Sequence, residues 1–423
     1  MKIYRYPDLP AGFYERSATD VSATVRRIIK EVRQHGDRAV RYFTRRYDRV
    51  VLADLRVDDA GIQRAVRDLE PKLAAALEAV RRNIRTFAVR QMKAYRAFEF
   101  QIRPGVFTGQ KVVPVDRVGI YVPAGRYPLV STLLMCAVPA QVAGVRQIAV
   151  CSPPSVQGSV APAILAAAGL LGIREVYRVG GAQAIAALAL GTRTIPAVDK
   201  IAGPGNTYVA QAKKALYGDC GIDGIAGPTE VMIIADCQAD PSFIAADLLA
   251  QAEHDTRANP VLVTDSRLLA RRVQRELKVQ LRSLATRAVA RKALAKNAAI
   301  ILVRDLAQAI EIANRKAPEH LELQVRRPRQ FQRQLRHFGS LFIGRHAAEA
   351  LGDYSSGLNH TLPTAGSARY TGGLSVRDFL KVQTTLRVTR RGLKAIGPDA
   401  ETLARAEGLD GHGKSVRRRL LVP

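Results

Sequence analysis

Short apolar runs alternate with alanine-rich segments along most of the chain from about residue 117 onward. Each run is bounded by glycine or proline and is too short for an ordinary helix, so it predicts a buried strand. The runs lie at residues 118–122, 148–151, 175–179, 231–235, 261–263 and 300–303, and the segments 161–171, 182–190, 207–217 and 241–254 predict helices. Strand–helix–strand alternation indicates an α/β protein with mainly parallel sheets.

The two ends of the chain lack this alternation. Apolar residues recur at helical spacing over residues 20–34 and predict an amphipathic helix that ends at Gly36. A long helical region is expected over residues 59–95. After about Ser375 the sequence becomes polar, basic and helical in character, so this tail should need another surface to pack on.

The chain carries 65 Lys and Arg against 37 Asp and Glu, a formal net charge of +28. Such a surface attracts polyanions whatever its fold. The basic residues are nevertheless spread along the chain, cluster only in the C-terminal segments RGLK and VRRRL, and are not interleaved with aromatic residues that could stack on bases. We therefore expect no specific nucleic-acid site. No apolar stretch is long enough to span a bilayer and no secretory signal is recognised, so we expect a cytoplasmic protein without a membrane partner.

Histidines in polar settings are the first candidates for chemistry. In DLLAQAEHD, Gln251 and His254 are three residues apart on a predicted helix, so an amide oxygen and an imidazole could share a cation. Zinc would need two further ligands, such as a carboxylate and another histidine. Spacing alone does not distinguish this half-site from an ordinary helix end.

Three other histidines lie in informative segments. Glu319 and His320 are adjacent in KAPEHLEL and can supply two proton-transfer groups, although an incidental pair would look the same. His360 closes GDYSSGLNH, a glycine-rich polar loop that also carries Asp353 and favours a binding site over packing. His412 lies in the tail, in ARAEGLDGH.

Two glycine-rich turns, VGGAQA at residues 179–184 and AGPGN at residues 202–206, precede predicted helices. The free backbone N–H groups of such helix N-termini can bind phosphates. Neither turn matches GxGxxG, so the standard dinucleotide fingerprint is absent and the nucleotide signal is modest.

Eight segments together resemble one family. They are RVGIYVPAG, VGGAQAIAALALGT, VDKIAGPGNTYV, AGPTEV, DLLAQAEHD, APEHLEL, GDYSSGLNHTLPT and LARAEGLDGH, in the order found in histidinol dehydrogenases. The resemblance covers about residues 20–415. It implies an NAD-dependent, zinc-containing homodimer that oxidises L-histidinol through L-histidinal to L-histidine, the last step of histidine biosynthesis.

The resemblance also implies which residues act. The single zinc ion of each subunit would be bound by Gln251, His254, Asp353 and His412, and the catalytic pair would be Glu319 and His320. Substrate contacts would come from Thr229, Gln251, His254, His320, Asp353, His360, Glu407 and His412, and NAD contacts from Tyr121, Gln183 and Asn206. His320 would take the hydroxyl proton, and Glu319 would activate water for the second step.

The family's fold implies two incomplete Rossmann-like domains. We expect residues 20–120 and 231–374 to form one discontinuous domain with the zinc and catalytic residues, and residues 121–230 to form the NAD-binding domain. Residues 1–19 would be an N-terminal arm. Residues 375–423 would be a helical tail that reaches the partner subunit, where Glu407 and His412 complete the partner's site.

Two positions depart from the family's usual pattern. Thr229 stands where serine is usual, and Leu358 stands where proline is usual; the basic charge is also atypical. One alternative is a related zinc- and NAD-dependent dehydrogenase of another polar alcohol or diol. Such an enzyme should differ at the residues that bind the imidazole and amine of L-histidinol. Another is a basic, non-catalytic nucleic-acid-binding protein, which should have lost metal ligands. The sequence retains both the residues expected to contact the substrate and the four expected metal ligands.

Overall fold

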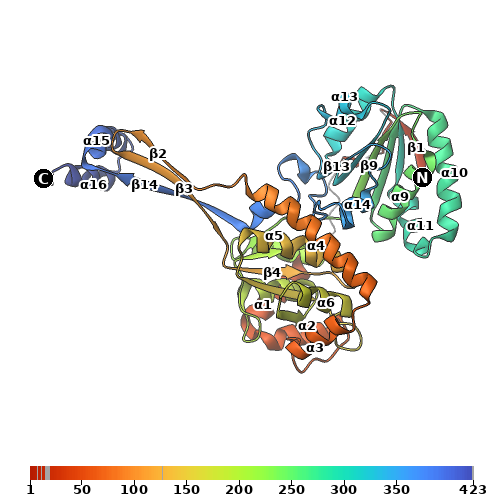
Figure 1. Cartoon of the computed structure of the whole chain (residues 1–423), viewed down its shortest axis with the longest axis horizontal. Helices are drawn as coiled ribbons and strands as arrows, with labels where there is room; N and C mark the ends of the chain where they lie inside the picture. The colour runs from red at the N-terminus through yellow and green to blue at the C-terminus, as the bar shows by residue number, and fades with distance from the viewer. Residues whose placement is uncertain (7, 11, 15–19, 126, 422–423) are drawn as a thin grey trace.

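The computed structural model describes residues 1–6, 8–10, 12–14, 20–125 and 127–421. Figure 1 shows two α/β bodies side by side and a narrow arm that projects from one of them and carries the C-terminal end. Both bodies are built on parallel sheets, which confirms the predicted fold class. None of the described helices is long and apolar enough to cross a lipid bilayer.

The first body contains a parallel sheet of five strands in the order β6-β5-β4-β7-β8. Its strands are β4 (Arg117–Tyr121), β5 (Gln147–Ser152), β6 (Glu175–Arg178), β7 (Lys200–Ala202) and β8 (Gly221–Ile222), and its connecting helices are α5 (Val130–Ala143), α6 (Pro162–Leu170), α7 (Gly181–Leu190) and α8 (Thr207–Leu216). Side chains of the same strand enter two different apolar clusters: in β4, Val118 belongs to one cluster and Tyr121 to the other. Burial on both faces explains the continuous apolar runs seen in the sequence.

The N-terminal helices also belong to the five-stranded body. These are α1 (Ser22–His35) and α2 (Asp37–Tyr47), which pack on α7, α3 (Asp59–Arg67), which packs on α6, and α4 (Pro71–Met92), which packs on α5. Val25 and Ile28 of α1 share an apolar cluster with Leu188 of α7. The prediction that residues 20–120 join residues 231–374 is therefore wrong, because their apolar faces are buried against the other body.

The second body contains a parallel sheet of six strands in the order β1-β11-β10-β9-β12-β13. Its strands are β1 (Lys2–Arg5), β9 (Glu230–Ala235), β10 (Asn259–Thr264), β11 (Ala299–Leu302), β12 (His320–Gln324) and β13 (Ser340–Ile343). Its helices are α9 (Pro241–His254), α10 (Arg267–Ser283), α11 (Arg287–Lys296), α12 (Leu306–Lys316), α13 (Pro328–Gln332) and α14 (Glu349–Tyr354). Because β1 pairs with β11, the first residues of the chain are an edge strand and not a separate arm.

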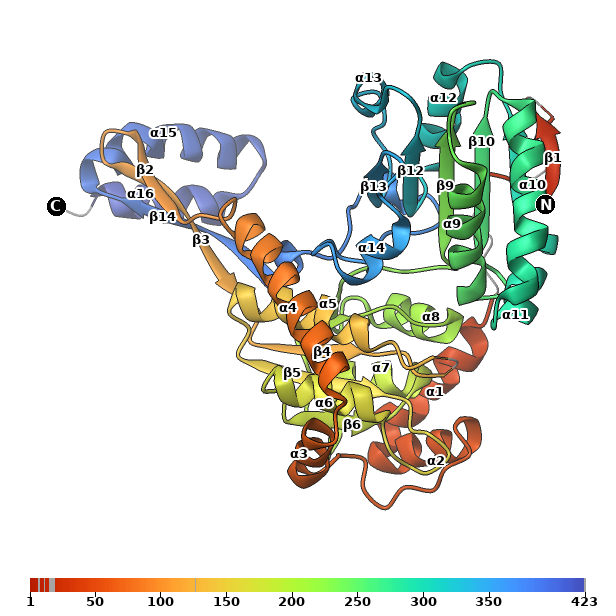
Figure 2. The ribbon, with the colours of Figure 1, turned by 45° about the vertical axis from the view of Figure 1, so that its right-hand side comes forward.

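The arm is a three-stranded antiparallel sheet in the order β14-β3-β2, followed by two helices (Figure 2). Its elements are β2 (Phe98–Arg103), β3 (Val106–Pro114), β14 (Leu380–Val388), α15 (Arg390–Ala406) and α16 (Asp410–Leu421). The helical part of the tail was expected, but β14 was not. Phe98, Phe100, Val382 and Leu386 are exposed on the arm, so it carries apolar side chains that this chain leaves uncovered.

Candidate active site

The catalytic and metal-binding candidates of the second body meet at the amino ends of two neighbouring strands. β12 begins at His320, directly after Glu319, and lies beside β9, which begins at Glu230. α9 ends at His254, and α14 carries Asp353. The usual position for a ligand in a parallel sheet is the carboxyl end of the strands, so the strand pattern alone would not have indicated this edge.

Glu319 is a buried carboxylate held by two donors. Its Oε2 accepts a hydrogen bond from the Thr229 hydroxyl at 2.6 Å and one from the Glu230 backbone N–H at 2.9 Å. Burial raises the pKa of Glu319 to about 7, although nearby His320 and the two donors act in the opposite direction. A carboxyl group with this pKa can exchange a proton near neutral pH.

The two ring nitrogens of His320 differ: Nδ1 has a hydrogen-bond partner and Nε2 has none. Nδ1 lies 3.3 Å from the backbone oxygen of Glu230, where an Nδ1–H can donate. Nε2 is buried, makes no hydrogen bond, and lies 3.4 Å from Asp353 Oδ1. Burial alone would lower the pKa of His320, but the carboxylates of Glu349, Glu319 and Asp353 raise it to about 10. In the protein alone, His320 is therefore the positive charge among these acids.

Asp353 links the catalytic pair to the polar loop that ends at His360. His360 lies with Nδ1 3.0 Å from the backbone oxygen of Asp353 and with Nε2 3.2 Å from the Thr132 hydroxyl. Burial lowers the pKa of His360, so its imidazole is neutral at ordinary pH. Burial would raise the pKa of Asp353, but His320 beside it, with His360 and His254 nearby, lowers it. Asp353 is therefore ionised.

A group of oxygen and nitrogen donors suited to a divalent metal lies beside the catalytic pair. Three side chains each offer one possible ligand atom, and these atoms lie within 4.8 Å of one another: His254, Glu349 and Asp353. Carboxylate and imidazole are ordinary ligands of zinc. The same pocket buries Glu319, Glu349 and Asp353, and among the described residues His320 is the cation that opposes the charges of the two glutamates, so a bound cation would relieve the repulsion between the carboxylates. The donor set therefore fits the predicted metal.

Gln251 is fully buried between Glu349 and Thr229. When the Thr229 hydroxyl hydrogen goes to Glu319, the Gln251 nitrogen can donate to the Thr229 oxygen and the Gln251 oxygen faces Glu349; the reversed amide points its nitrogen at the Glu349 carboxylate, 2.7 Å from Oε2, but its oxygen then competes for the Thr229 hydrogen. As a metal ligand, Gln251 would take the first orientation, with its oxygen on the acidic side. A bound cation would favour that orientation because it attracts the oxygen and repels the amide N–H.

The tail does not bring its candidates to this site. Glu407 ends α15 and His412 lies in the first turn of α16, at the far end of the arm (Figure 1). The other predicted metal ligands, Gln251, His254 and Asp353, are on the second body. A single chain thus assembles three of the four predicted ligands and adds Glu349, which the sequence reading did not select.

The three residues predicted to hold NAD line one cleft together with Thr229 and His254. The cleft has a volume of about 650 Å³, within the usual range for a cofactor site. Tyr121 ends β4, Gln183 lies in the first turn of α7, and the Asn206 side chain caps α8 by accepting from two backbone N–H groups. The cleft therefore joins the carboxyl edge of the five-stranded sheet to the catalytic edge of the six-stranded one.

The turn before Asn206 is fixed by close backbone packing. Gly203 has φ +110°, and a Cβ there would lie 2.2 Å from the backbone oxygen of Tyr121. Asp223 Oδ2 accepts a hydrogen bond from the Gly203 N–H at 2.7 Å, and its carboxylate also pairs with the buried Lys213. Lys213 and Asp223 carry no proposed chemical role, so their contribution is to hold this wall of the cleft.

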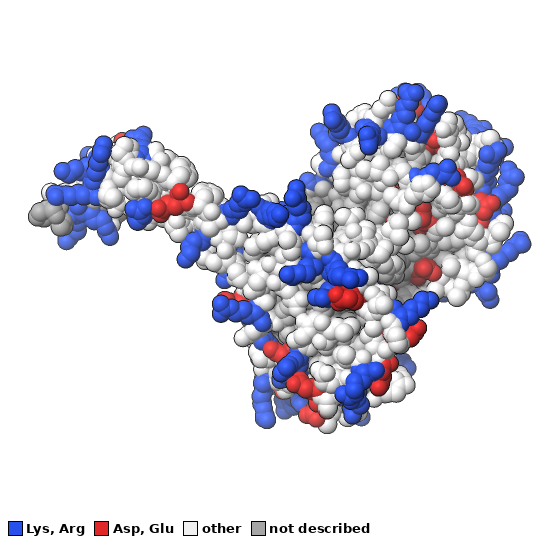
Figure 3. All heavy atoms as spheres, in the orientation of Figure 1, with Lys and Arg blue, Asp and Glu red and all other residues white. Residues whose placement is uncertain are grey.

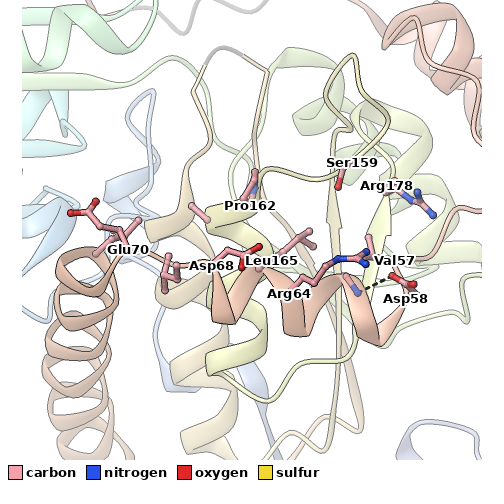
Figure 4. Close-up of a pocket in the computed structure, with 14 residues that line it drawn as sticks. Val57, Asp58, Arg64, Asp68, Glu70, Ser159, Pro162, Leu165 and Arg178 are labelled. Atoms are coloured by element: carbon pink, nitrogen blue, oxygen red, sulfur yellow. Dashed lines mark hydrogen bonds between the residues drawn. The ribbon is translucent and has the colours of Figure 1, made fainter.

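A second hollow of about 620 Å³ lies on the outside of the five-stranded body, beside α3, α4 and α6 (Figure 4). Its polar lining includes Asp58, Arg64, Asp68 and Arg178. The Asp58 side chain accepts from the Gly61 N–H, which caps α3 (Figure 4). None of the predicted site residues lines this hollow, so it is separate from the cleft.

Comparison with known proteins identifies one family. The histidinol dehydrogenase family model matches residues 14–420. A histidinol dehydrogenase of Lactiplantibacillus plantarum is 45% identical over 399 residues, which cover 94% of this chain and 92% of that protein. A histidinol dehydrogenase of Rhodospirillum rubrum is 46% identical over 407 residues, which cover 96% of this chain and 93% of that protein. The crystal structure of a histidinol dehydrogenase from Elizabethkingia anophelis matches with a TM-score of 0.93 at 36% identity, over 99% of this chain and 98% of that one.

Proposed function

The chain belongs to the histidinol dehydrogenase family, and on this premise we propose that its cleft oxidises L-histidinol with NAD as the hydride acceptor and zinc as the bound metal. The chain is accordingly an oxidoreductase of histidine biosynthesis. The reaction carries L-histidinol through L-histidinal to L-histidine. Two hydrides leave for two NAD molecules, one water supplies the second carboxylate oxygen, and three protons are released.

The observation that best supports this proposal is the free Nε2 of His320 beside the buried Glu319 carboxylate. The Glu230 carbonyl favours the tautomer with hydrogen on Nδ1, which leaves the Nε2 lone pair for a substrate proton. Two buried proton acceptors at one site suit a reaction in two steps, because each step releases a proton from oxygen.

In the first step His320 accepts the proton of the substrate hydroxyl at Nε2 as hydride leaves the same carbon. The product at this stage is the aldehyde. Asp353, 3.4 Å from Nε2, stabilises the imidazolium that forms. His360 stays neutral and can donate a hydrogen bond to the substrate without competing for the proton.

In the second step Glu319 accepts a proton from the water that adds to the aldehyde. The imidazolium of His320 returns its proton to the aldehyde oxygen as water adds, and the neutral His320 then accepts a hydroxyl proton as the hydrated aldehyde loses its hydride. Thr229 donates its hydroxyl hydrogen to Glu319 and so holds the carboxylate in place. We thus assign Thr229 chiefly to positioning Glu319, where the family resemblance implied a substrate contact.

Zinc, when bound, would orient the amino and imidazole nitrogens of the substrate and add positive charge to an acidic pocket. Gln251, His254 and Asp353 are the residues of this chain that would hold it. The same positive charge would oppose the carboxylates that raise the pKa of His320 to about 10. Metal loading should therefore bring His320 closer to the neutral form that a base requires.

The fourth ligand and one substrate contact are assigned to a second copy of the chain. His412 and Glu407 lie on the arm, away from their own subunit's site, and the arm exposes apolar side chains such as Phe98 and Phe100. Burying such side chains against a partner is favourable. A symmetric homodimer would place each arm at the other subunit's cleft.

The test is NAD reduction by the purified protein with L-histidinol, before and after chelation and after zinc is added back. The proposal predicts activity that chelation abolishes and zinc restores. Other polar alcohols and diols serve as competitors under the same conditions. Faster turnover of one of them than of L-histidinol would assign the site to a different alcohol.

A further inference from the structure

About a third of the chain's net positive charge lies on one surface that the catalytic site does not use. α10 and α11 lie together on the outside of the six-stranded body, at the edge opposite the arm (Figure 1). We define the α10–α11 face as their ten exposed basic residues: Arg267, Arg271, Arg272, Arg275, Lys278, Arg282, Arg287, Arg291, Lys292 and Lys296. Lys and Arg side chains project from this edge in the space-filling view (Figure 3).

The charge of this segment is nearly all of one sign. Residues 267–296 contain these ten basic residues and one acidic residue, Glu276, a formal +9 of the chain's +28. The sequence alone suggested that basic residues cluster only near the C-terminus. Helical geometry changes that conclusion, because residues separated by three or four positions project from one side while Leu269, Val273 and Leu277 face the core.

No acidic side chain of the described chain neutralises the face. None of its ten residues forms an ion pair with a described acidic group. Basic residues also stand four apart within each helix, as in Arg267–Arg271, Lys278–Arg282 and Lys292–Lys296, which is repulsive. The helices therefore carry uncompensated repulsion that an anionic partner would relieve.

The face is also separate from the reaction. None of its residues lines the cleft of Tyr121, Thr229 and His254. Its charge has no contact with the proposed substrate or cofactor, so the oxidoreductase activity does not explain it.

We propose that the α10–α11 face binds the phosphate backbone of double-stranded nucleic acid without reading its sequence. Residues 267–296 contain no aromatic residue, so the face has no platform on which unpaired bases could stack. A 17-residue helix such as α10 spans about 25 Å, along which a duplex presents phosphates on both strands. Arginine, which dominates the face, suits phosphate oxygens through its planar fork of donors.

An anionic membrane fits this face less well. The apolar side of α10 is buried against the sheet, and the large apolar residues exposed on α10 are Leu268 and Val279. Helices that lie in a bilayer surface insert a broad apolar face that includes aromatic residues or leucines. The α10–α11 face has nothing comparable to insert.

The experiment measures binding of the full-length protein to a fluorescent duplex of random sequence over a range of salt concentrations. One variant carries Arg271→Gln, Arg275→Gln, Arg291→Gln and Lys292→Gln. A control removes the same charge from exposed positions of α4, through Lys72→Gln, Arg82→Gln, Arg85→Gln and Arg90→Gln. Glutamine retains helix propensity, and the activity with L-histidinol should be unchanged in both variants.

The wild type should bind with an affinity that falls steeply with salt. The α10–α11 variant should bind at least about tenfold more weakly at low salt, with a log–log salt slope reduced by about two to four, while the α4 variant should stay within about twofold of wild type. Equal losses in both variants would show that total charge, and not this face, is responsible, and would overturn the proposal. Binding to vesicles of anionic lipid but not to duplex would overturn it in favour of a membrane.

Discussion

Removing the hydroxyl of Thr229 should slow the second oxidation in a way that pH can correct. The hydroxyl donates to Glu319 Oε2 at 2.6 Å inside a buried pocket, and this donor lowers the pKa of a carboxyl that burial raises to about 7. Thr229→Val keeps the side chain's shape but leaves Glu319 with the Glu230 N–H as its remaining donor.

The size of the effect follows from the strength of that hydrogen bond. A hydrogen bond to a charged group contributes about 1.5–3 kcal/mol. Its loss should raise the pKa of Glu319 by about one to two units. The pH at which half of Glu319 is ionised should move from about 7 to about 8–9, so the rate at pH 7 should fall about five- to fiftyfold and recover as the pH rises.

The assay is NAD reduction starting from L-histidinal, so that only the second step is observed, between pH 6 and pH 9.5. Thr229→Ser is the matched control, because it keeps the donor and should keep the wild-type profile. If Thr229→Val gave a lower rate with an unshifted profile, the hydroxyl would not govern the ionisation of Glu319, and the reasoning would fail.

Three further predictions concern the cleft and the arm. Lys213→Met should lower the free energy of unfolding in urea by about 3–5 kcal/mol, because Asp223 is left buried without its cation. Gly203→Ala should weaken NAD binding in calorimetry and lower stability by at least about 1–3 kcal/mol, because its Cβ would meet a backbone oxygen of β4 at 2.2 Å. A mixture of inactive His412→Ala and His320→Ala proteins, unfolded and refolded together, should regain about a quarter of wild-type activity if sites are shared in a dimer, whereas no recovery would indicate that each chain completes its own site.

Local signals predicted six of the eleven strands of the two parallel sheets, and β1, β7, β8, β12 and β13 were missed. α9 was predicted over residues 241–254 and is found at Pro241–His254, because Asp240 caps its start and proline occupies its first turn. The six predicted strands all exist, since burial on both faces produces continuous apolar runs. β14 was missed because its nine residues are mostly exposed and polar, and its partner β3 lies far away in sequence.

The composition of the site was only partly accessible to sequence reasoning. Glu319, His320 and Asp353 meet as expected. Glu349 was missed, because nothing in its local sequence distinguishes it from a surface glutamate; only the packing of α14 against α9 buries it beside Gln251. Assignment of the N-terminal helices to a body also failed, because amphipathic faces specify that a helix packs but not on which sheet.

The most direct test of the account counts the NADH formed from each L-histidinol at completion by the wild type and by Glu319→Gln. The account assigns the two oxidations to two neighbouring bases at one site. The wild type should therefore form two NADH per L-histidinol, while Glu319→Gln should form about one and accumulate L-histidinal, because its amide cannot accept the proton of water. Two NADH per L-histidinol from Glu319→Gln at the wild-type rate would contradict the assignment of the second step to Glu319.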